Sequence, residues 1–209
     1  MQIQECRAFV AQLIPAIERH LLGGGRLTYA GMPFTTVVKV EPDGLSVNAM
    51  LYMDSSRWGV EVSDLMLSGF VPDDAIKFGI AHELGHAFGG PLLDSLCIAP
   101  SATVLKPGVT MGDDAEMRSG APTEVIADLG AAYILNLMGM SWEAIIATAD
   151  QGNQNIFDTA WNGDHPPAAM RADCIRSFVE LLRWGGSFEN SAKAVCLSMV
   201  GTRPLAGAH

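Results

Sequence analysis

The sequence is poor in positive charge and has no long uninterrupted apolar run. Its 209 residues carry 13 Lys and Arg against 23 Asp and Glu, which gives a formal net charge of −10. Nucleic acids and anionic membranes are bound through basic patches, so this balance argues against both as partners. No stretch reaches the roughly 18 apolar residues of a membrane span. The nearest candidate, residues 125–140, is interrupted by Asp128 and Asn136.

Cysteine is also scarce, and the N-terminus lacks the features of a secretory signal. Residues 1–7, MQIQECR, contain no basic region followed by an apolar core. Without an export signal, reduced and partly buried thiols are a simpler interpretation than two disulfides. We therefore expect a soluble, cytoplasmic protein. Its four cysteines show no CxxC spacing and are Cys6, Cys97, Cys174 and Cys196.

The residue pattern predicts a single domain over residues 1–209 with two lobes. A composition of 49% hydrophobic and 17% charged residues is typical of a globular chain. Residues 1–90 combine an amphipathic helix, β-branched runs over 27–70 that favour a small, mostly antiparallel sheet, and a second helix. Residues 91–121 are rich in Pro, Gly and acidic side chains and predict a long irregular segment, a candidate lid. Residues 122–209 form a helical lobe.

Helical periodicity and end signals set the expected helix bounds. The first helix should stop at Gly23-Gly24-Gly25, and the second should end at Gly89-Gly90-Pro91. The expected helices cover residues 2–22, 72–88, 123–138, 142–149, 168–184 and 191–199.

The second helix contains a motif with metal-ligand spacing, His82-Glu-Leu-Gly-His86. Residues four apart share a helix face, so both imidazoles can reach one ion. Glu83 would project beside the metal and accept a proton from bound water, whose pKa zinc lowers to roughly 7. The alternative is a chance match in an ordinary helix, because short motifs produce false positives.

A third ligand decides between these interpretations. A metzincin would have a histidine at position 92, where this chain has Leu92. The next candidate is Glu124, in the first turn of the following predicted helix, with Asp128 four residues later on the same face. Glu124 can complete a zinc site, and Asp128 can accept a hydrogen bond from the far nitrogen of a ligand histidine. The helix continues with apolar residues, and ionised carboxylates in that setting need a metal or a partner.

Together these motifs resemble the gluzincin zinc metallopeptidases, the family that includes the CaaX prenyl proteases, the heat-shock membrane proteases and the minigluzincins. The resemblance rests on HELGH, on Glu124-x-x-x-Asp128, and on Asp164-His-Pro-Pro167 with Arg171 four residues on, and it covers about residues 44–178. It implies an α+β, zincin-like metalloprotease fold. The membrane members of the family carry transmembrane helices, so their prenylated substrates are not expected here.

The resemblance also implies roles for individual residues. His82, His86 and Glu124 would bind Zn²⁺, Glu83 would be the general base, and Asp128 would accept a hydrogen bond from a ligand histidine. His165 would help stabilise the oxyanion of the tetrahedral intermediate, and Arg171 would hold the loop that carries it. A second donor near the developing oxyanion is also reasonable on physical grounds, because zinc shares its charge with the attacking hydroxide.

The expected function is therefore that of a zinc metalloendopeptidase acting on a peptide or protein substrate. One alternative is a latent or inactive zinc-binding module that binds a partner protein through the same cleft. The intact Glu83 argues against it, because a module without catalysis has no need of a base. A zinc hydrolase that acts on a non-peptide amide is a further alternative.

Overall fold

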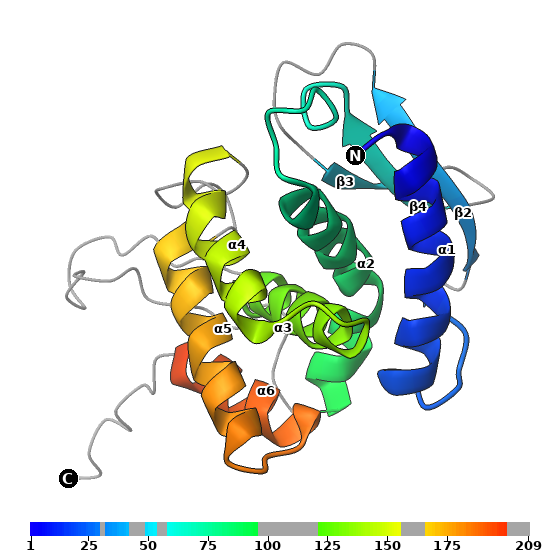
Figure 1. Cartoon of the computed structure of the whole chain (residues 1–209). Coiled ribbons are helices and arrows are strands. Elements are labelled where there is room, and N and C mark those ends of the chain that lie inside the picture. The colour runs from blue at the N-terminus through cyan, green and yellow to red at the C-terminus, as the bar shows by residue number, and fades with distance from the viewer. Residues whose placement is uncertain (30–31, 42–48, 54–57, 96–120, 156–165, 200–209) are drawn as a thin grey trace, which may run out of the picture.

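Six helices and four strands make up the part of the chain that the structure describes. This computed structural model describes residues 1–29, 32–41, 49–53, 58–95, 121–155 and 166–199. In chain order the elements are α1 (Ile3–His20), β1 (Thr28–Tyr29), β2 (Met32–Glu41), β3 (Ala49–Met53), β4 (Trp58–Ser63), α2 (Asp73–Ser95), α3 (Ala121–Leu137), α4 (Trp142–Asn155), α5 (Ala168–Arg183) and α6 (Phe188–Met199). The fold is mostly helical, with few strands (Figure 1). None of the described helices combines the length and apolar character that a membrane crossing requires.

The strands pair in the order β1-β2-β4-β3. β1 with β2 and β3 with β4 are antiparallel, but the central pair, β2 with β4, is parallel. Two of the three pairings are antiparallel, in agreement with the predicted mostly antiparallel sheet, whereas the sequence did not predict the parallel central pair. All six residues of β4 are buried, so this strand takes the interior position between β2 and β3 and leaves β3 at the edge.

Helix α1 lies beside the strands and packs on β2 (Figure 1). Its buried residues recur every three or four positions, as predicted for an amphipathic helix: Cys6, Val10, Leu13 and Ile17. Pro15 stays inside the helix and is exposed. The glycine stop is confirmed, because Gly23 and Gly24 take positive φ angles of 56° and 90° that suit a helix C-terminus.

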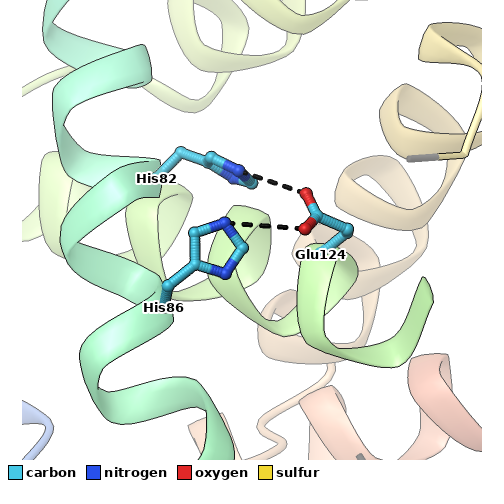
Figure 2. Close-up of side chains that lie close together, drawn as sticks. All are labelled: His82, His86 and Glu124. Atoms are coloured by element: carbon cyan, nitrogen blue, oxygen red, sulfur yellow. Dashed lines mark ion pairs between the residues drawn. The ribbon is translucent and has the colours of Figure 1, made fainter. Parts of the chain in front are cut away.

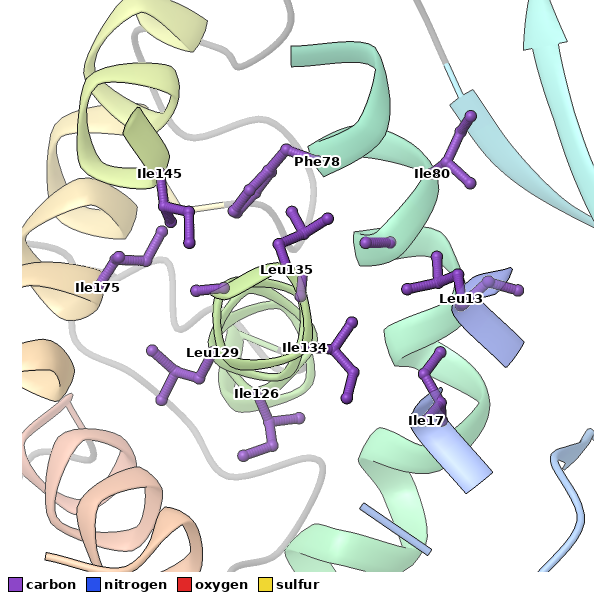
Figure 3. Close-up of a cluster of buried hydrophobic side chains, with 14 of the residues drawn as sticks. Leu13, Ile17, Phe78, Ile80, Ile126, Leu129, Ile134, Leu135, Ile145 and Ile175 are labelled. Carbon is purple, nitrogen blue, oxygen red and sulfur yellow. The ribbon is translucent and has the colours of Figure 1, made fainter. Parts of the chain in front are cut away.

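Helix α3 runs through the middle of the helical part and is buried on all sides except near its C-terminal end, where Leu137 is exposed. Figure 3 looks along its axis and shows its apolar side chains pointing outward all around it. A helix that is apolar all round is stable only where neighbours cover every face. Here the surrounding helices are α1, α2, α4, α5 and α6. The carboxylates of Glu124 and Asp128, which α3 carries, therefore lie in the protein interior.

Helices α2 and α3 cross at unusually short range because Gly85 faces Ala127. A methyl group added at Gly85 would lie 2.7 Å from the Ala127 Cα and 2.9 Å from its carbonyl oxygen. Gly130 of α3 in turn leaves room for the Phe88 ring, which would lie 2.4 Å from a methyl group added there. The two backbones can therefore approach closely in one register only.

Two helices extend beyond their predicted ends. α2 continues through Gly89-Gly90-Pro91 to Ser95, so the predicted stop is wrong and the irregular segment cannot begin at residue 91. Leu93 is fully buried, and burying this side chain outweighs the weak helix propensity of the preceding residues. α4 likewise reaches Asn155 rather than residue 149. The rest of the predicted irregular segment, 96–120, lies outside the described residues.

Two matched alanine substitutions test the close crossing. Gly85→Ala should destabilise the protein, because overpacking against backbone costs about 1–3 kcal/mol and outweighs the ~1 kcal/mol gain in helix propensity. The methyl group of Gly79→Ala, on the same helix, would crowd the flexible terminal methyl of Met66, 2.9 Å away, and would be in ordinary contact with the Ala49 Cβ at 3.8 Å. This variant should be neutral or stabilising. Chemical denaturation midpoints measure both variants, and equal stability of the two would contradict the crossing geometry.

Candidate metal centre

Two helices bring together the three predicted ligands. His82 and His86 lie one turn apart on α2, and Glu124 lies in the first turn of α3, facing both imidazoles (Figure 2). The His82 Nε2 is 3.4 Å from the Glu124 Oε2, and the His86 Nε2 is 3.6 Å from the Glu124 Oε1. One ligand atom from each residue lies within 4.8 Å of the other two.

These distances fit a tetrahedral zinc ion. Bonds of about 2.0–2.1 Å at the tetrahedral angle hold neighbouring ligand atoms about 3.3–3.4 Å apart. The two separations, 3.4 Å to the Glu124 Oε2 and 3.6 Å to its Oε1, lie at or just above this value. The donor set also fits, because two imidazole nitrogens and one carboxylate leave a fourth position open, as catalytic zinc sites do. The donor set and the two separations from Glu124 are therefore compatible with zinc.

Glu83 lies beside this group without belonging to it. Its Oε1 is 4.0 Å from the His82 Nε2, the nitrogen that faces the other ligands. The side chain is 15% exposed, whereas that of His82 is 5% exposed, so Glu83 stands at the open side of the site. The structure therefore places a carboxylate next to the metal position, where water can reach it.

Asp128 fixes the orientation of His82 from behind. The His82 Nδ1 lies 2.8 Å from the Asp128 Oδ1, which is the hydrogen bond to a ligand histidine that the sequence predicted. With the proton on Nδ1, the lone pair of Nε2 points toward His86 and Glu124. A carboxylate behind an imidazole fixes its tautomer and strengthens it as a metal ligand.

Arg171 of α5 completes this arrangement. It is 3% exposed and donates from Nε to the Asp128 Oδ2 and from Nη2 to the Asp128 Oδ1, both at 2.6 Å. Arg171 Nη2 also lies 3.2 Å from His82 Nδ1. Arg171 Nη2 and His82 Nδ1 both donate to the Asp128 Oδ1, and these two donors therefore lie side by side.

This pairing of Arg171 was not predicted. The sequence pattern assigned it to the loop of His165, which lies outside the described residues, so that role stays a prediction. A signal for its burial was present, because Arg171 falls on the apolar face of α5. The buried residues of that face include Ala168, Ala172, Ile175 and Phe178. An arginine on such a face requires a buried carboxylate.

The network shifts the pKa values of all three of its members. Burial disfavours the charged guanidinium of Arg171, but the opposing Asp128 carboxylate leaves the pKa of Arg171 raised. Burial disfavours the charged imidazole, but the Asp128 carboxylate more than compensates and raises the pKa of His82 to about 9. Burial would raise the pKa of Asp128, yet the Arg171 guanidinium and His82 hold it well below its usual range. Asp128 is therefore ionised, and His82 is a more basic donor than an ordinary histidine.

Zinc binding tests the ligand assignment. We expect one zinc per chain after zinc-replete purification, measured by elemental analysis. His86→Ala removes a ligand and should abolish stoichiometric binding. His20→Ala changes an exposed histidine in the last turn of α1 and should leave the zinc content unchanged. Full zinc retention by His86→Ala would show that the ion is held elsewhere.

Replacing Asp128 tests whether its contacts with His82 and Arg171 support the candidate metal site. Asp128→Asn leaves the buried Arg171 charge uncompensated, which should cost about 3–5 kcal/mol of stability. It should also weaken zinc binding about 10- to 100-fold, because His82 loses its anchor. Asp150→Asn breaks a half-exposed pair with Arg176 and should cost no more than about 1 kcal/mol. Thermal unfolding and zinc titration measure both effects, and similar losses in the two variants would contradict the role of Asp128.

No family model, no curated protein and no solved structure matches this chain. The residues themselves therefore carry the functional argument. They are two helical pairs with four-residue spacing, His82 with His86 and Glu124 with Asp128, brought together across the contact between α2 and α3.

Proposed function

We propose that this protein is a zinc-dependent metalloendopeptidase of the gluzincin type. The observation that carries the proposal is the convergence of His82, His86 and Glu124 within 4.8 Å, with the Glu83 carboxylate beside them. A structural zinc site is closed by four protein ligands. Among the described residues this group offers three ligands and a neighbouring carboxylate, which is the composition of a hydrolytic site.

The arrangement of the elements supports a zincin-like α+β fold. A small sheet stands beside the first ligand helix, α2, and α3 supplies the third ligand from within a helical lobe (Figure 1). The gluzincin resemblance of the sequence leads to the same arrangement. We assign the zincin-like fold on these two grounds, as part of the proposal.

The proposed mechanism gives each residue a separate task. Zinc, when bound, supplies a Lewis acid that polarises the scissile carbonyl and activates water near neutral pH. Glu83 accepts a proton from the attacking water and delivers it to the leaving amine. Asp128 and Arg171 hold the His82 ring in place throughout. His165 remains the candidate for the second oxyanion donor.

Strand β3 is the candidate surface for the peptide backbone. It stands at one end of the strand order and pairs with β4 alone among the described strands. At Gly79, one turn before His82, a methyl group would lie only 3.8 Å from the Ala49 Cβ, so β3 passes close to the ligand helix. An extended peptide could add to this edge by main-chain hydrogen bonds, which recognise no particular sequence.

Replacing Glu83 separates catalysis from metal binding. Glu83→Gln keeps the side-chain volume and can still hydrogen-bond water, but it cannot accept a proton. It should retain zinc and lose about 100- to 10,000-fold in the rate of peptide hydrolysis. The assay measures cleavage of an unstructured protein mixture, with and without a chelator and with zinc added back. Chelation should stop cleavage by the wild type, and zinc should restore it.

A control and a contrary result complete this test. Glu180→Gln alters an exposed glutamate of α5 and should leave hydrolysis unchanged. Retention of most activity by Glu83→Gln would refute the proposed mechanism. A zinc-loaded wild type that cleaves no peptide bond would instead favour the partner-binding alternative.

A further inference from the structure

A cavity of about 490 Å³ lies where the helices α1, α2, α3 and α4 meet. All four helices contribute to its lining, and none of the three proposed zinc ligands belongs to that lining. Its volume falls within the range of about 300–1,000 Å³ that small-molecule sites occupy. We call it the four-helix cavity, and it is separate from the candidate metal centre.

One wall of the four-helix cavity carries a pair of opposite charges. Asp74 and Lys77 lie one turn apart on α2, and both line the cavity. The Lys77 Nζ is 3.2 Å from the Asp74 Oδ1, and the two side chains are 34% and 48% exposed. Water screens an ion pair that is this exposed, so the pair is weak. Both groups can therefore bind a ligand without the loss of a strong interaction.

Two helix ends form a further wall of the cavity. Helix α3 ends at Leu137, and α4 begins after Ser141, whose Oγ accepts a hydrogen bond from the Ala144 backbone nitrogen at 3.1 Å. The turn between the two helices lines the cavity. The C-terminal end of a helix carries a partial negative charge and the N-terminal end a partial positive charge. This wall therefore also favours a ligand that has one charge of each sign.

The remaining lining is apolar. Leu135 is fully buried, and Phe9, Met138 and Met140 are half-buried around it. Methionine side chains are unbranched and flexible, so they adapt to aliphatic groups of different shape. The cavity thus offers an adaptable apolar surface next to an ammonium group and a carboxylate.

The spacing of the charges selects the kind of ligand. In an α-amino acid the ammonium nitrogen and the nearer carboxylate oxygen lie about 3 Å apart, because one carbon atom joins the two groups. This matches the 3.2 Å between the Lys77 Nζ and the Asp74 Oδ1. A peptide carries its two terminal charges on different residues, and each residue adds up to ~3.8 Å to their separation. Free amino acids therefore fit the charged pair better than peptides do.

We propose that the four-helix cavity binds a free α-amino acid with an apolar, aliphatic side chain. The carboxylate of the amino acid accepts hydrogen bonds from the Lys77 Nζ, and its ammonium group donates to the Asp74 carboxylate. Its side chain lies against Phe9, Met138 and Met140. No covalent bond forms or breaks, and the site does not depend on the proposed peptidase activity.

A second cavity, of about 410 Å³ between α5 and α6, lacks this combination of charges. Its described lining residues include one carboxylate, Asp173, and the free thiol of Cys174, but no cationic side chain. Cys6 and Cys196 are free as well, in agreement with the expected reduced thiols, whereas Cys97 lies outside the described residues. An amino acid would find no cationic partner for its carboxylate in this cavity.

A titration with L-leucine, followed by NMR on the full-length, zinc-loaded protein, tests the proposal. We expect saturable shift changes at the backbone amides of Gly139, Met140 and Ser141. Leucinamide lacks the carboxylate, 4-methylpentanoate lacks the ammonium group, and glycine lacks the side chain. Each should bind at least about tenfold more weakly than leucine. Leucine that coordinates zinc would instead shift the signals of His82 and His86, which identifies that event separately.

Two variants with matched controls locate the binding site. Lys77→Met removes the cation and should weaken leucine binding at least about tenfold. Lys193→Met changes a half-buried lysine of α6 outside the cavity and should have no effect. Ala144→Leu extends a larger side chain into the cavity and should block binding while both charged residues remain. Ala147→Leu alters an exposed position of α4 and should leave binding unchanged.

Four results would overturn the proposal. The first is a titration without saturable shifts around the cavity, and the second is shifts confined to the zinc ligands. The third is binding of any of the three analogues as tight as that of leucine. The fourth is wild-type affinity in either Lys77→Met or Ala144→Leu.

Discussion

The close contact between α2 and α3 is the constraint on which the candidate centre depends. Its closest point is Gly85, the fourth residue of HELGH, which faces the Ala127 backbone. Ala127 lies three residues after Glu124 on α3. The contact that joins the two helices therefore also fixes where the Glu124 carboxylate lies along α3 relative to the imidazoles of His82 and His86. A larger side chain at Gly85 would separate the helices and, with them, the ligands.

The buried network behind His82 extends this constraint to a third helix. Asp128 of α3 bonds to His82 of α2 and to Arg171 of α5, so three helices are tied at one carboxylate. Buried ion pairs are a weak source of stability, because desolvation offsets most of the attraction, and apolar replacements are often at least as stable. The pair between Asp128 and Arg171 is better explained by its position, because it fixes the orientation of the His82 imidazole, a proposed zinc ligand.

The residue positions that could be predicted in the candidate site are those that depend on the geometry of a single helix. The spacing of His82 and His86, and of Glu124 and Asp128, is a property of one helix at a time, so the residues alone indicated which side chains share a face. Asp128 was also expected to need a partner, because the rest of its helix is apolar. The partner of Arg171 was missed because it depends on which helix lies across from α5.

The same distinction explains which features of the fold the sequence did not predict. The parallel pairing of β2 with β4 depends on which strand is buried on both faces, and local alternation of side chains does not determine that. The extension of α2 through Gly89-Gly90-Pro91 depends on the burial of Leu93, which tertiary packing decides. Sequence signals for helix ends reflect only the local preferences of the chain. Where several end points are possible, tertiary packing decides which one the helix adopts.

Zinc K-edge X-ray absorption on the protein loaded with one equivalent of zinc tests the central claim most directly. We expect two imidazole nitrogens and carboxylate oxygen at about 2.0–2.2 Å, with no sulfur neighbour. The His86→Ala variant should lose one imidazole from this spectrum or lose the ion. Sulfur at about 2.3 Å would contradict the account, because zinc would then be held by cysteines and not by His82, His86 and Glu124.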